Sequence, residues 1–241
     1  MSPKASTPHT LSIDIGGTGI KMIRLDASGE AIGERQRELT PKPASPEAVV
    51  DVIRAMVALQ DPFDRVSVGF PGVVVQGVVR TANNLGTELW RGFDIDDAVT
   101  RVTGKSTRVI NDADLQGYGV VEKKGVELVL TLGTGLGSAL FVDGRLVPNL
   151  EIAHHPLRKD KTYEELVGAS ALAKSGKKKW RRRVSLAIET LAPIFNYDRL
   201  HLGGGNAKKL APPLPERVEL FQNVEGLEGG AALWDDAGPK G

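Results

Sequence analysis

Residues 11–30 read LSIDIGGTGIKMIRLDASGE, in which an apolar run is followed by two adjacent glycines, a threonine and a second apolar run. Glycine tolerates the backbone angles of a tight turn, and the alternation of apolar and polar residues after the turn is typical of a strand. The closing ASGE segment reads as another turn. The stretch therefore predicts a β-hairpin rather than a strand that leads directly into a helix.

The same order of elements returns in residues 127–147, which read ELVLTLGTGLGSALFVDGRLV. An apolar strand precedes a turn of Gly and Thr, a second strand follows, and an Asp-Gly pair marks the next hairpin. A strand, a glycine turn and a strand thus occur twice in one chain. This duplication predicts two similar lobes, each of which offers a backbone-rich turn to a shared cleft.

Helices and further strands are expected around the two hairpins. Residues 45–60 have Ser45 as a helix N-cap, Pro46 at the first helical position and apolar residues at helical spacing. Residues 106–122 read as a strand that ends at Asn111 and opens a helix. Farther along we expect a basic helical run, a long helix, a strand in 197–206, a proline-rich connector, a strand in 217–221 and a short closing helix.

Composition narrows the class of protein. The 241 residues are 41% apolar, enough for a substantial core, and no window reaches the roughly 18 consecutive apolar residues of a membrane span. We therefore expect a cytoplasmic protein with no membrane partner. The absence of cysteine excludes disulfides and thiolate metal sites. The 31 Lys and Arg nearly balance 30 Asp and Glu, so net charge predicts no general attraction to nucleic acid.

The first glycine turn suggests phosphate binding. Its glycines let backbone N–H groups approach an anion closely, Thr18 adds a hydroxyl donor, and Asp14 could contact a hydrated Mg²⁺ ion. The turn matches neither GxxxxGK[ST] nor the GxGxxG that precedes a helix, and a glycine hairpin alone is often ordinary turn chemistry. The second turn, Thr131 to Gly137, strengthens the interpretation, because two such turns can hold neighbouring phosphoryl groups.

Asp112 is the candidate base. It follows the apolar strand that ends at Asn111, a place from which a carboxylate can face a cleft and accept the proton of an attacking hydroxyl. The alternative is that Asn111 or Asp112 only caps the next helix.

The segment KSGKKKWRRR, Lys174 to Arg183, holds seven basic residues in ten, with a Trp among them. A solvated helix face and a nucleic-acid surface are two interpretations. A third is a track for the tail of a linear polyphosphate, which carries about one negative charge per phosphate. The run alone does not decide between them.

Six motifs follow one another along the chain: DIGGTGIK, GFPGVV, NDAD, TLGTGLGSALFVDG, EIAHH and HLGGGN. In this order and spacing they resemble the ROK family of sugar kinases, within the actin-like ATPase superfamily. The segments LGTGLGSALFVDGRLVPN and TYEELVGASALAKSGKKKW are most similar to the bacterial polyphosphate glucokinases of that family. The resemblance covers Leu11 to Leu233, nearly the whole chain.

The resemblance implies an α/β protein of the actin-like ATPase (ribonuclease H-like) fold, with two lobes around a central cleft. We expect an N-terminal lobe over residues 1–112, a C-terminal lobe over 113–228, and a closing helix over 229–241 that packs back on the first lobe. Sugar binding would close the cleft and exclude water. The family likeness also suggests a homodimer.

The resemblance assigns roles to residues that match the family's motifs. Asp112 matches the catalytic base that deprotonates the sugar 6-hydroxyl. The positions that match sugar-binding residues are Asn84, Asn111, Glu151, His154 and Glu164. The positions that match phosphate-binding residues are Asp14, Gly16, Gly17, Thr18, Lys21, Thr134 and Gly135, with Mg²⁺ expected near Asp14. Gly203, Gly204 and Gly205 match the turn near an adenine base, and the speculative polyphosphate track comprises Lys177, Lys178, Lys179, Arg181 and Arg182.

The chain also departs from the family pattern. The ExGH motif reads EIAHH, so Ala153 replaces a glycine before His154. Many relatives carry a CxCGxxGC zinc motif, whereas this chain has no cysteine, so we expect no zinc site and regard His154 and His155 as poor zinc ligands. Polyphosphate glucokinases also lack the zinc motif, so its absence supports that branch.

The expected activity is transfer of a terminal phosphoryl group from polyphosphate to the 6-hydroxyl of glucose, with Mg²⁺. The first alternative is an ATP-dependent ROK hexokinase acting on glucose, fructose or mannose, with the same catalytic residues. A second is a ROK transcription repressor, disfavoured because only 13 residues precede Asp14. A third, a non-catalytic sugar sensor, is disfavoured because Asp112 and both glycine turns are present.

Overall fold

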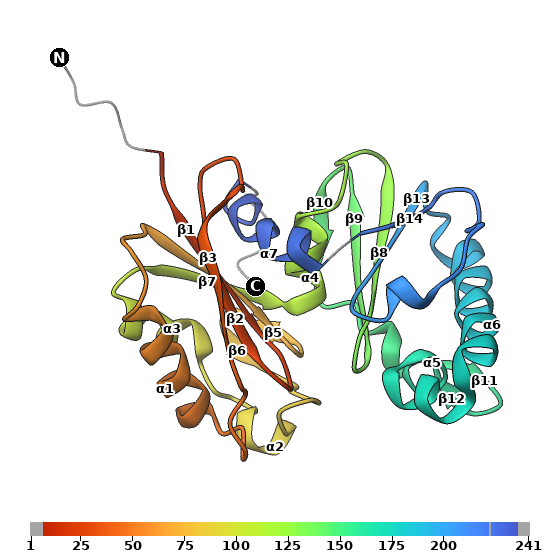
Figure 1. Cartoon of the computed structure of the whole chain (residues 1–241), viewed down its shortest axis with the longest axis horizontal. Helices are drawn as coiled ribbons and strands as arrows, with labels where there is room; N and C mark the ends of the chain where they lie inside the picture. The colour runs from red at the N-terminus through yellow and green to blue at the C-terminus, as the bar shows by residue number, and fades with distance from the viewer. Residues whose placement is uncertain (1–6, 222, 236–241) are drawn as a thin grey trace. The chain divides into compact units, whose positions relative to one another are not determined.

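The computed structural model describes residues 7–221 and 223–235, and these divide into two compact units (Figure 1). One unit runs to Gly119 and resumes at Gly226, and the other spans Val120–Glu225. The predicted boundary after residue 112 would separate helix α4 (Asp112–Tyr118) from the strands it packs on, whereas the unit keeps it. Of the predicted closing helix, residues 236–241 lie outside the described residues.

The first unit is built on a five-stranded sheet with the strand order β3-β2-β1-β4-β7. Strands β1, β2 and β3 are antiparallel neighbours, and β4 and β7 run parallel to β1. The sheet thus contains the predicted hairpin. The strands are β1 Thr10–Ile15, β2 Ile20–Leu25, β3 Ala31–Glu38, β4 Arg65–Phe70 and β7 Ser106–Asn111. Smaller elements are β5 Val74–Val75, β6 Val78–Val79 and α2 Thr87–Trp90.

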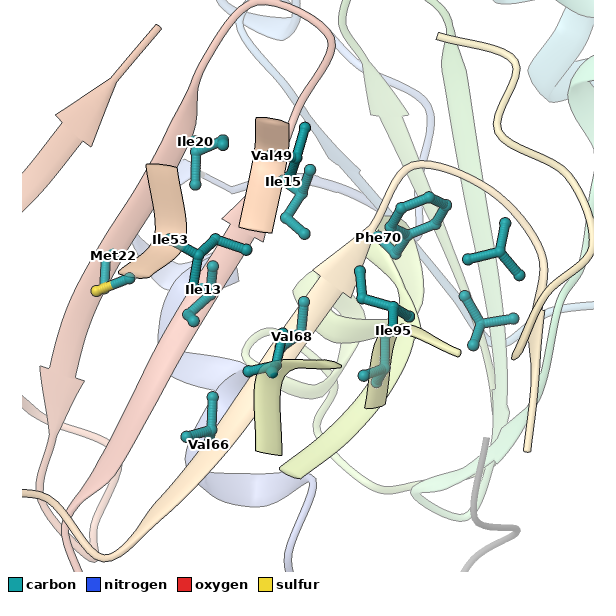
Figure 2. Close-up of a cluster of buried hydrophobic side chains, with 14 of the residues drawn as sticks. Ile13, Ile15, Ile20, Met22, Val49, Ile53, Val66, Val68, Phe70 and Ile95 are labelled. Carbon is teal, nitrogen blue, oxygen red and sulfur yellow. The ribbon is translucent and has the colours of Figure 1, made fainter. Parts of the chain in front are cut away.

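One face of this sheet is apolar because alternate residues of its strands are branched aliphatic or aromatic. Helix α1 (Pro46–Val57) covers this face together with α3 (Ile95–Thr103). The N-cap of α1 is Ser45, as predicted, and its side chain accepts a hydrogen bond from Ala48 N. Figure 2 shows side chains from β1, β2, β4, α1 and α3 gathered in this core. The labelled members are Ile13, Ile15, Ile20, Met22, Val49, Ile53, Val66, Val68, Phe70 and Ile95.

The intervening residues of β1 and β4 are small or polar, and α4 and the closing helix of the same unit pack against this face of the sheet. Ser12 Oγ donates to Leu227 O at 2.7 Å, and Ser67 Oγ donates to Gly230 O at 2.6 Å. Both acceptors belong to α7 (Asn223–Ala232), which starts earlier than the sequence pattern predicted. Two buried hydroxyls thus tie the closing helix to the sheet of the first unit.

The second unit repeats the plan with the strand order β10-β9-β8-β13-β14. Again the first three strands in sequence are antiparallel neighbours, and two later strands run parallel to the first. The strands are β8 Val126–Leu132, β9 Leu136–Val142, β10 Arg145–Val147, β13 Arg199–Gly203 and β14 Val218–Leu220. The equal strand order in both sheets confirms the predicted duplication.

The core of the second unit lies between its sheet and helices α5 (Tyr163–Val167) and α6 (Ala169–Phe195). Helix α6 is two helices joined at Gly176, whose φ of 73° is not helical. Trp180 is fully buried, and its Nε1 donates to Val167 O at 2.7 Å. The aromatic residue of the basic run is therefore a core anchor, which leaves no exposed ring there for stacking on bases. Short elements are β11 Pro156–Arg158, β12 Lys161–Thr162 and the 3₁₀ helices η1 Ile152–His154 and η2 Ala207–Lys209.

Within the described residues, no helix is long and apolar enough to cross a membrane.

Candidate functional site

In the first unit, the predicted base and the predicted metal-binding carboxylate come to one end of the sheet. Asp14 is paired with Gly69 in the parallel register of β1 and β4. A Cβ atom on Gly69 would lie 3.3 Å from Asp112 Cα, so α4 starts directly over this glycine. Because β1, β4 and β7 are parallel, their carboxyl ends share an edge, which is where ligands bind in open α/β sheets.

The turn between β1 and β2 is closed by Gly16 N, which donates to Gly19 O at 3.0 Å. Thr40 supports it from outside the hairpin, since its hydroxyl donates to Gly16 O at 2.6 Å. Among the residues that the structure describes, the amide groups of Gly17 and Thr18 have no hydrogen-bond acceptor. Successive amide groups of this kind can bind phosphate oxygens, as predicted for this turn.

Asn84 lies against this turn. A Cβ atom on Gly17 would come within 3.1 Å of Asn84 Cβ and 3.2 Å of Asn84 O, so glycine fits this close approach and a larger residue would crowd it. Asn84 itself is exposed. The structure therefore brings a predicted sugar-binding residue next to a predicted phosphate-binding turn within one unit.

Asp14 and Lys21 form an ion pair across the hairpin, with Nζ 2.6 Å from Oδ2. The two side chains are 14% and 27% exposed, so the pair is accessible without being fully solvated. Lys21 neutralises the carboxylate and holds it at the carboxyl end of β1. Since Mg²⁺ sites in kinases use one or two carboxylates together with water and substrate phosphates, Asp14 fits the expected ion.

Asp112 is half-buried in the first turn of α4, and its Oδ1 accepts from Ala113 N at 2.8 Å. A carboxylate at this end of a helix is favoured by the helix dipole. A carboxylate can accept a proton from an attacking hydroxyl. The position therefore suits a general base.

Asn111 is the N-cap of α4, the alternative considered for the NDAD motif. Its Oδ1 accepts from Ala113 N at 2.8 Å and from Asp114 N at 3.3 Å, while its Nδ2 donates to Gly72 O at 3.2 Å. These bonds link the helix start to the loop that contains GFPG. Asn111 thus orients the segment that carries Asp112, and its predicted contact with sugar stays a prediction.

In the second unit, the glycine turn between β8 and β9 is held from several sides. Gly133 N donates to Gly135 O at 3.1 Å, and Ala169 N donates to Thr134 O at 3.0 Å. Leu136 N donates to Glu164 Oε2 at 3.3 Å. A predicted sugar-binding carboxylate and a predicted phosphate-binding turn are therefore in direct contact.

Position 135 lies close to the same carboxylate. A Cβ atom there would lie 2.1 Å from Glu164 Oε2, so any larger residue would require the Glu164 carboxylate to move. Glu164 itself is carried by α5, whose N-cap Thr162 forms a capping box with Glu165. The short helix is thus fixed at its start and presents Glu164 to the turn.

Glu151 and His154 are also close, with His154 Nε2 3.5 Å from Glu151 Oε2. Burial raises the pKa of Glu151, the nearby His154 opposes that rise, and the charge of Glu164 adds to it. Glu151 is therefore influenced by the other two side chains that are predicted to bind sugar in this unit. A shifted pKa beside a second carboxylate is a common property of functional sites.

The three glycines after β13 differ in what they do. Gly203 lies under the ring of Phe221, where a Cβ atom would meet the ring at 2.1 Å. Gly204 has a φ of 85°, and a Cβ atom there would lie 2.6 Å from the backbone of Leu132. Gly205 has a negative or extended φ and open space around it. Packing thus accounts for the first two glycines, whereas no packing contact explains the third.

The basic residues of the predicted track are carried by the part of α6 that follows Gly176. The exposed members are Lys177, Lys178, Lys179 and Arg182, whereas Arg181 is half-buried and its Nε donates to Lys209 O at 2.6 Å. Within the described part of the chain, none of these five lies within ion-pair distance of a carboxylate. Their charge is therefore available to an external anion.

Sequence reasoning missed three residues at these turns: Thr40, Asn206 and Lys209. Asn206 is buried, and its Nδ2 donates to Gly133 O at 2.9 Å. Lys209 Nζ donates to Asn206 Oδ1 at 2.6 Å. The spacing of Asn206 and Lys209 directly after the glycines was a usable signal, whereas nothing in the sequence points to Thr40.

No group of three or more His, Cys, Asp or Glu side chains able to hold a metal ion is found among residues 7–221 and 223–235. His155 is engaged otherwise, since its Nδ1 lies 2.9 Å from Pro156 O. A Mg²⁺ ion bound through one carboxylate and phosphate oxygens does not require such a group.

Comparison with known proteins identifies relatives across nearly the whole chain. Over 249 residues the chain is 35% identical to the polyphosphate glucokinase of Mycobacterium tuberculosis strain CDC 1551, with 95% of this chain and 93% of the relative covered. It is 34% identical over 255 residues to the polyphosphate glucokinase of Mycobacterium leprae, with 95% and 78% covered.

Solved structures give the same answer. The inorganic polyphosphate/ATP-glucomannokinase from Arthrobacter sp. strain KM matches with a TM-score of 0.85 and 34% identity, covering 94% of this chain and 98% of that one. The ROK family glucokinase from Streptomyces griseus matches in fold with a TM-score of 0.79 and 20% identity, covering 93% and 98%. These likenesses confirm the predicted actin-like ATPase fold. The sequence model of the ROK family matches residues 10–151, and the chain belongs to the ROK family.

Proposed function

We propose that this protein is a polyphosphate-dependent glucokinase, which transfers a terminal phosphoryl group to the 6-hydroxyl of glucose. The observation that carries the proposal is the placement of Asp112 at the start of α4, over Gly69. It lies at the same sheet end as the amides of Gly17 and Thr18, which have no acceptor within the part of the chain that the structure describes. The identity of 35% over 95% of the chain to polyphosphate glucokinases supports the substrates.

Asp112 accepts the proton of the 6-hydroxyl as the oxygen attacks the terminal phosphorus. A bond forms between O6 and phosphorus, the bond from phosphorus to the bridging oxygen of the donor breaks, and the shortened polyphosphate leaves with the electron pair. The products are glucose 6-phosphate and a donor one phosphate shorter. In such reactions the protein contributes mainly positioning and charge stabilisation.

Sugar hydroxyls are held by Glu151, His154 and Glu164 of the second unit, and the family likeness separately implies sugar contacts for Asn84 and Asn111. In the second unit, His154 lies 3.5 Å from Glu151, and the charge of Glu164 acts on Glu151, which supports a sugar-binding role for these three residues. Carboxylates and an imidazole can accept or donate hydrogen bonds to several hydroxyls at once. Glu164 also contacts the glycine turn, so sugar and donor sites share this residue.

Phosphoryl oxygens are held by the amides of the two glycine turns and by Lys21. A bound Mg²⁺ supplies charge neutralisation at those oxygens, and the carboxylate of Asp14 would hold it. The basic residues Lys177, Lys178, Lys179, Arg181 and Arg182 take the tail of a polyphosphate. The exposure of Lys177, Lys178, Lys179 and Arg182, and the absence of carboxylate partners for all five in the described chain, support this role.

A second candidate donor is ATP. The relative from Arthrobacter is named a polyphosphate/ATP-glucomannokinase, and Gly205 leaves open space at the turn that matches an adenine-binding position. The same name extends the candidate acceptors to mannose. We also propose a homodimer in solution, which light scattering would test.

The first experiment is incubation of the purified protein with glucose, Mg²⁺ and either polyphosphate or ATP, with an Asp112→Asn variant as the control. Faster formation of glucose 6-phosphate from polyphosphate supports the proposal. Activity with ATP alone selects the second donor, and near-normal turnover by the Asp112→Asn protein would remove Asp112 from its role.

A further inference from the structure

A continuous set of hydrogen bonds links the basic helix to the glycine turn of the second unit. Arg181 Nε donates to Lys209 O at 2.6 Å, and Lys209 Nζ donates to Asn206 Oδ1 at 2.6 Å. Asn206 Nδ2 then donates to Gly133 O at 2.9 Å. Three side chains thus connect α6 with the turn at Gly133.

Asn206 is the fixed point of this set. It is 9% exposed, its backbone N donates to Leu132 O at 2.9 Å, and both ends of its side-chain amide are engaged. Because the amide oxygen accepts from Lys209 while the amide nitrogen donates to Gly133, the orientation of the group is determined by its partners. Asn206 therefore places Lys209 relative to the turn.

Lys209 reaches Asn206 because η2 is a single 3₁₀ turn, in which residues three apart lie over one another. Its ammonium group has three donors and uses one on a neutral amide oxygen. No carboxylate lies within ion-pair distance of it among the described residues. The ammonium group of Lys209 is thus held by the residue that supports the predicted phosphate-binding turn, and no carboxylate among the described residues neutralises it.

We infer that Lys209 is a donor-binding cation, which holds phosphate groups of the polyphosphate behind the one that is transferred, and that Arg181 positions it. The inference rests on the proposed function and adds to it a residue that joins the glycine turn to the exposed lysines of α6. A linear polyphosphate carries charge along its whole length, so a row of cations from Lys209 to α6 binds it better than it binds a compact nucleotide.

Lys208 provides a matched control. It precedes Lys209 in the chain, carries the same charge and is exposed, but it has no hydrogen bond to Asn206 in the structure. A general effect of lost positive charge would appear equally in both positions. A specific effect of the held ammonium group would appear only at Lys209.

The test compares Lys209→Gln, Lys209→Arg, Lys208→Gln and Arg181→Gln with the natural protein. Gln at 209 keeps an N–H donor for Asn206 while removing the charge, so the turn stays supported. We expect Lys209→Gln to raise KM for polyphosphate at least about tenfold with little change in kcat, because a hydrogen bond to a charged group is lost. Lys209→Arg restores most of the affinity, and Lys208→Gln changes KM less than about twofold, as an exposed charge does.

Two further readouts separate binding from support of the fold. The rise in KM of Lys209→Gln should be larger for long polyphosphate than for ATP, and its KM should depend less steeply on salt. Arg181→Gln should raise KM for polyphosphate without lowering kcat, since it acts through Lys209. Equal effects at 208 and 209, or a fall in kcat with unchanged KM, would overturn the inference while leaving the proposed function intact.

Calorimetric titration of the same proteins with polyphosphate, without glucose, keeps the inference testable if no turnover is seen. Absence of turnover with both donors would contradict the proposed function. Weaker binding by Lys209→Gln than by Lys208→Gln would then still support a polyphosphate site at Lys209. Equal binding by the two variants would contradict it.

Discussion

Lys21 Nζ lies 2.6 Å from Asp14 Oδ2, across the hairpin that the first glycine turn closes. The two residues were predicted to serve phosphate and magnesium separately, yet in the structure they are partners. The pair fixes the carboxylate at the end of β1 and leaves one of its oxygens for another ligand. A kinase that binds Mg²⁺ and phosphate together can rearrange such a pair at low cost, because a partly exposed ion pair contributes little to stability.

Asp14→Asn should raise the Mg²⁺ concentration needed for half-maximal activity about tenfold or more, because the carboxylate that holds the hydrated ion is lost. Lys21→Met should instead raise KM for the donor and leave the Mg²⁺ requirement nearly unchanged. Titration of Mg²⁺ at saturating glucose measures both. An unchanged Mg²⁺ requirement in Asp14→Asn would exclude Asp14 as the ion's ligand.

Asp112→Asn should lower kcat by about 10²- to 10⁴-fold, the usual contribution of a positioned proton acceptor. The change keeps an oxygen that can accept from Ala113 N, so the start of α4 and the thermal midpoint should be preserved. Asn111→Ala, by contrast, should cost about 1 kcal/mol of stability through the lost N-cap. Measuring turnover and unfolding on both proteins separates the base from the cap.

The raised pKa of Glu151 predicts a dependence of stability on pH. Burial is the main cause, so the folded state disfavours the charged carboxylate and binds more protons than the unfolded state just above the ordinary pKa of 4.5. Stability contributed at this position is therefore present below 4.5 and falls as pH rises toward the raised pKa. The side-chain amide of the Glu151→Gln variant does not titrate, so the variant does not lose this stability. As pH rises from 4.5 toward the raised pKa, the thermal midpoint of Glu151→Gln should therefore increase relative to that of the natural protein.

The measurement is thermal unfolding without sugar at several pH values, with glucose binding as the second readout. We expect weaker glucose binding in Glu151→Gln at every pH, since a neutral amide replaces the carboxylate. A constant difference in midpoint between the two proteins across pH would show that Glu151 does not titrate differently on folding.

Gly204→Ala should lower the stability of the protein, whereas Gly205→Ala should leave it nearly unchanged. Alanine at 204 meets the backbone of Leu132 and requires a φ of 85°, so it should destabilise the protein by about 1–3 kcal/mol. Alanine at 205 enters open space and should change stability by less than about 0.5 kcal/mol. If ATP approaches Gly205, KM for ATP should rise in that variant. Denaturant unfolding together with donor KM values tests both statements.

Trp234 fastens the closing segment to the sheet of the first unit. Its ring makes cation–π contacts with Arg65 and Arg108, whose guanidinium carbons lie 5.2 and 4.5 Å from the ring centre, and its Nε1 donates to Ser67 Oγ at 2.8 Å. Trp234→Ala should destabilise the protein by about 2 kcal/mol through lost packing and cation–π contacts. Trp234→Phe should lose less, and urea unfolding compares the two.

The hairpins, the repeated plan and the N-cap of α1 could be predicted because each follows from a local pattern. Alternation specifies strands, glycine and threonine specify turns, and Ser45 before Pro46 specifies a helix start. The position of Asp112 directly after an apolar strand, at the start of a helix, could also be predicted in this way, whereas its role as the base stays a prediction. The start of α7 was missed because residues before Leu227 lack an apolar period that marks it.

Contacts between residues distant in sequence could not be predicted from such patterns. Thr40 supports the turn at Gly16, and Gly203 is required by the ring of Phe221, and neither pairing has a local signature. The glycines after β13 matched a ligand-binding motif, while two of them are explained by packing. The double role of Asn206 depends on the register of β13 beside β8, which only the folded sheet defines.

The break in α6 at Gly176 has an electrostatic consequence. Three consecutive lysines, 177 to 179, occupy the first turn of the helix that follows it, where the positive end of the helix dipole makes cations unfavourable. Rising ionic strength therefore acts on this segment in two directions: it screens the repulsion and stabilises the turn, while it weakens the attraction of the same lysines for a polyanion. Concentrated salt should therefore order this helix while weakening the binding of a polyanion that we propose for it.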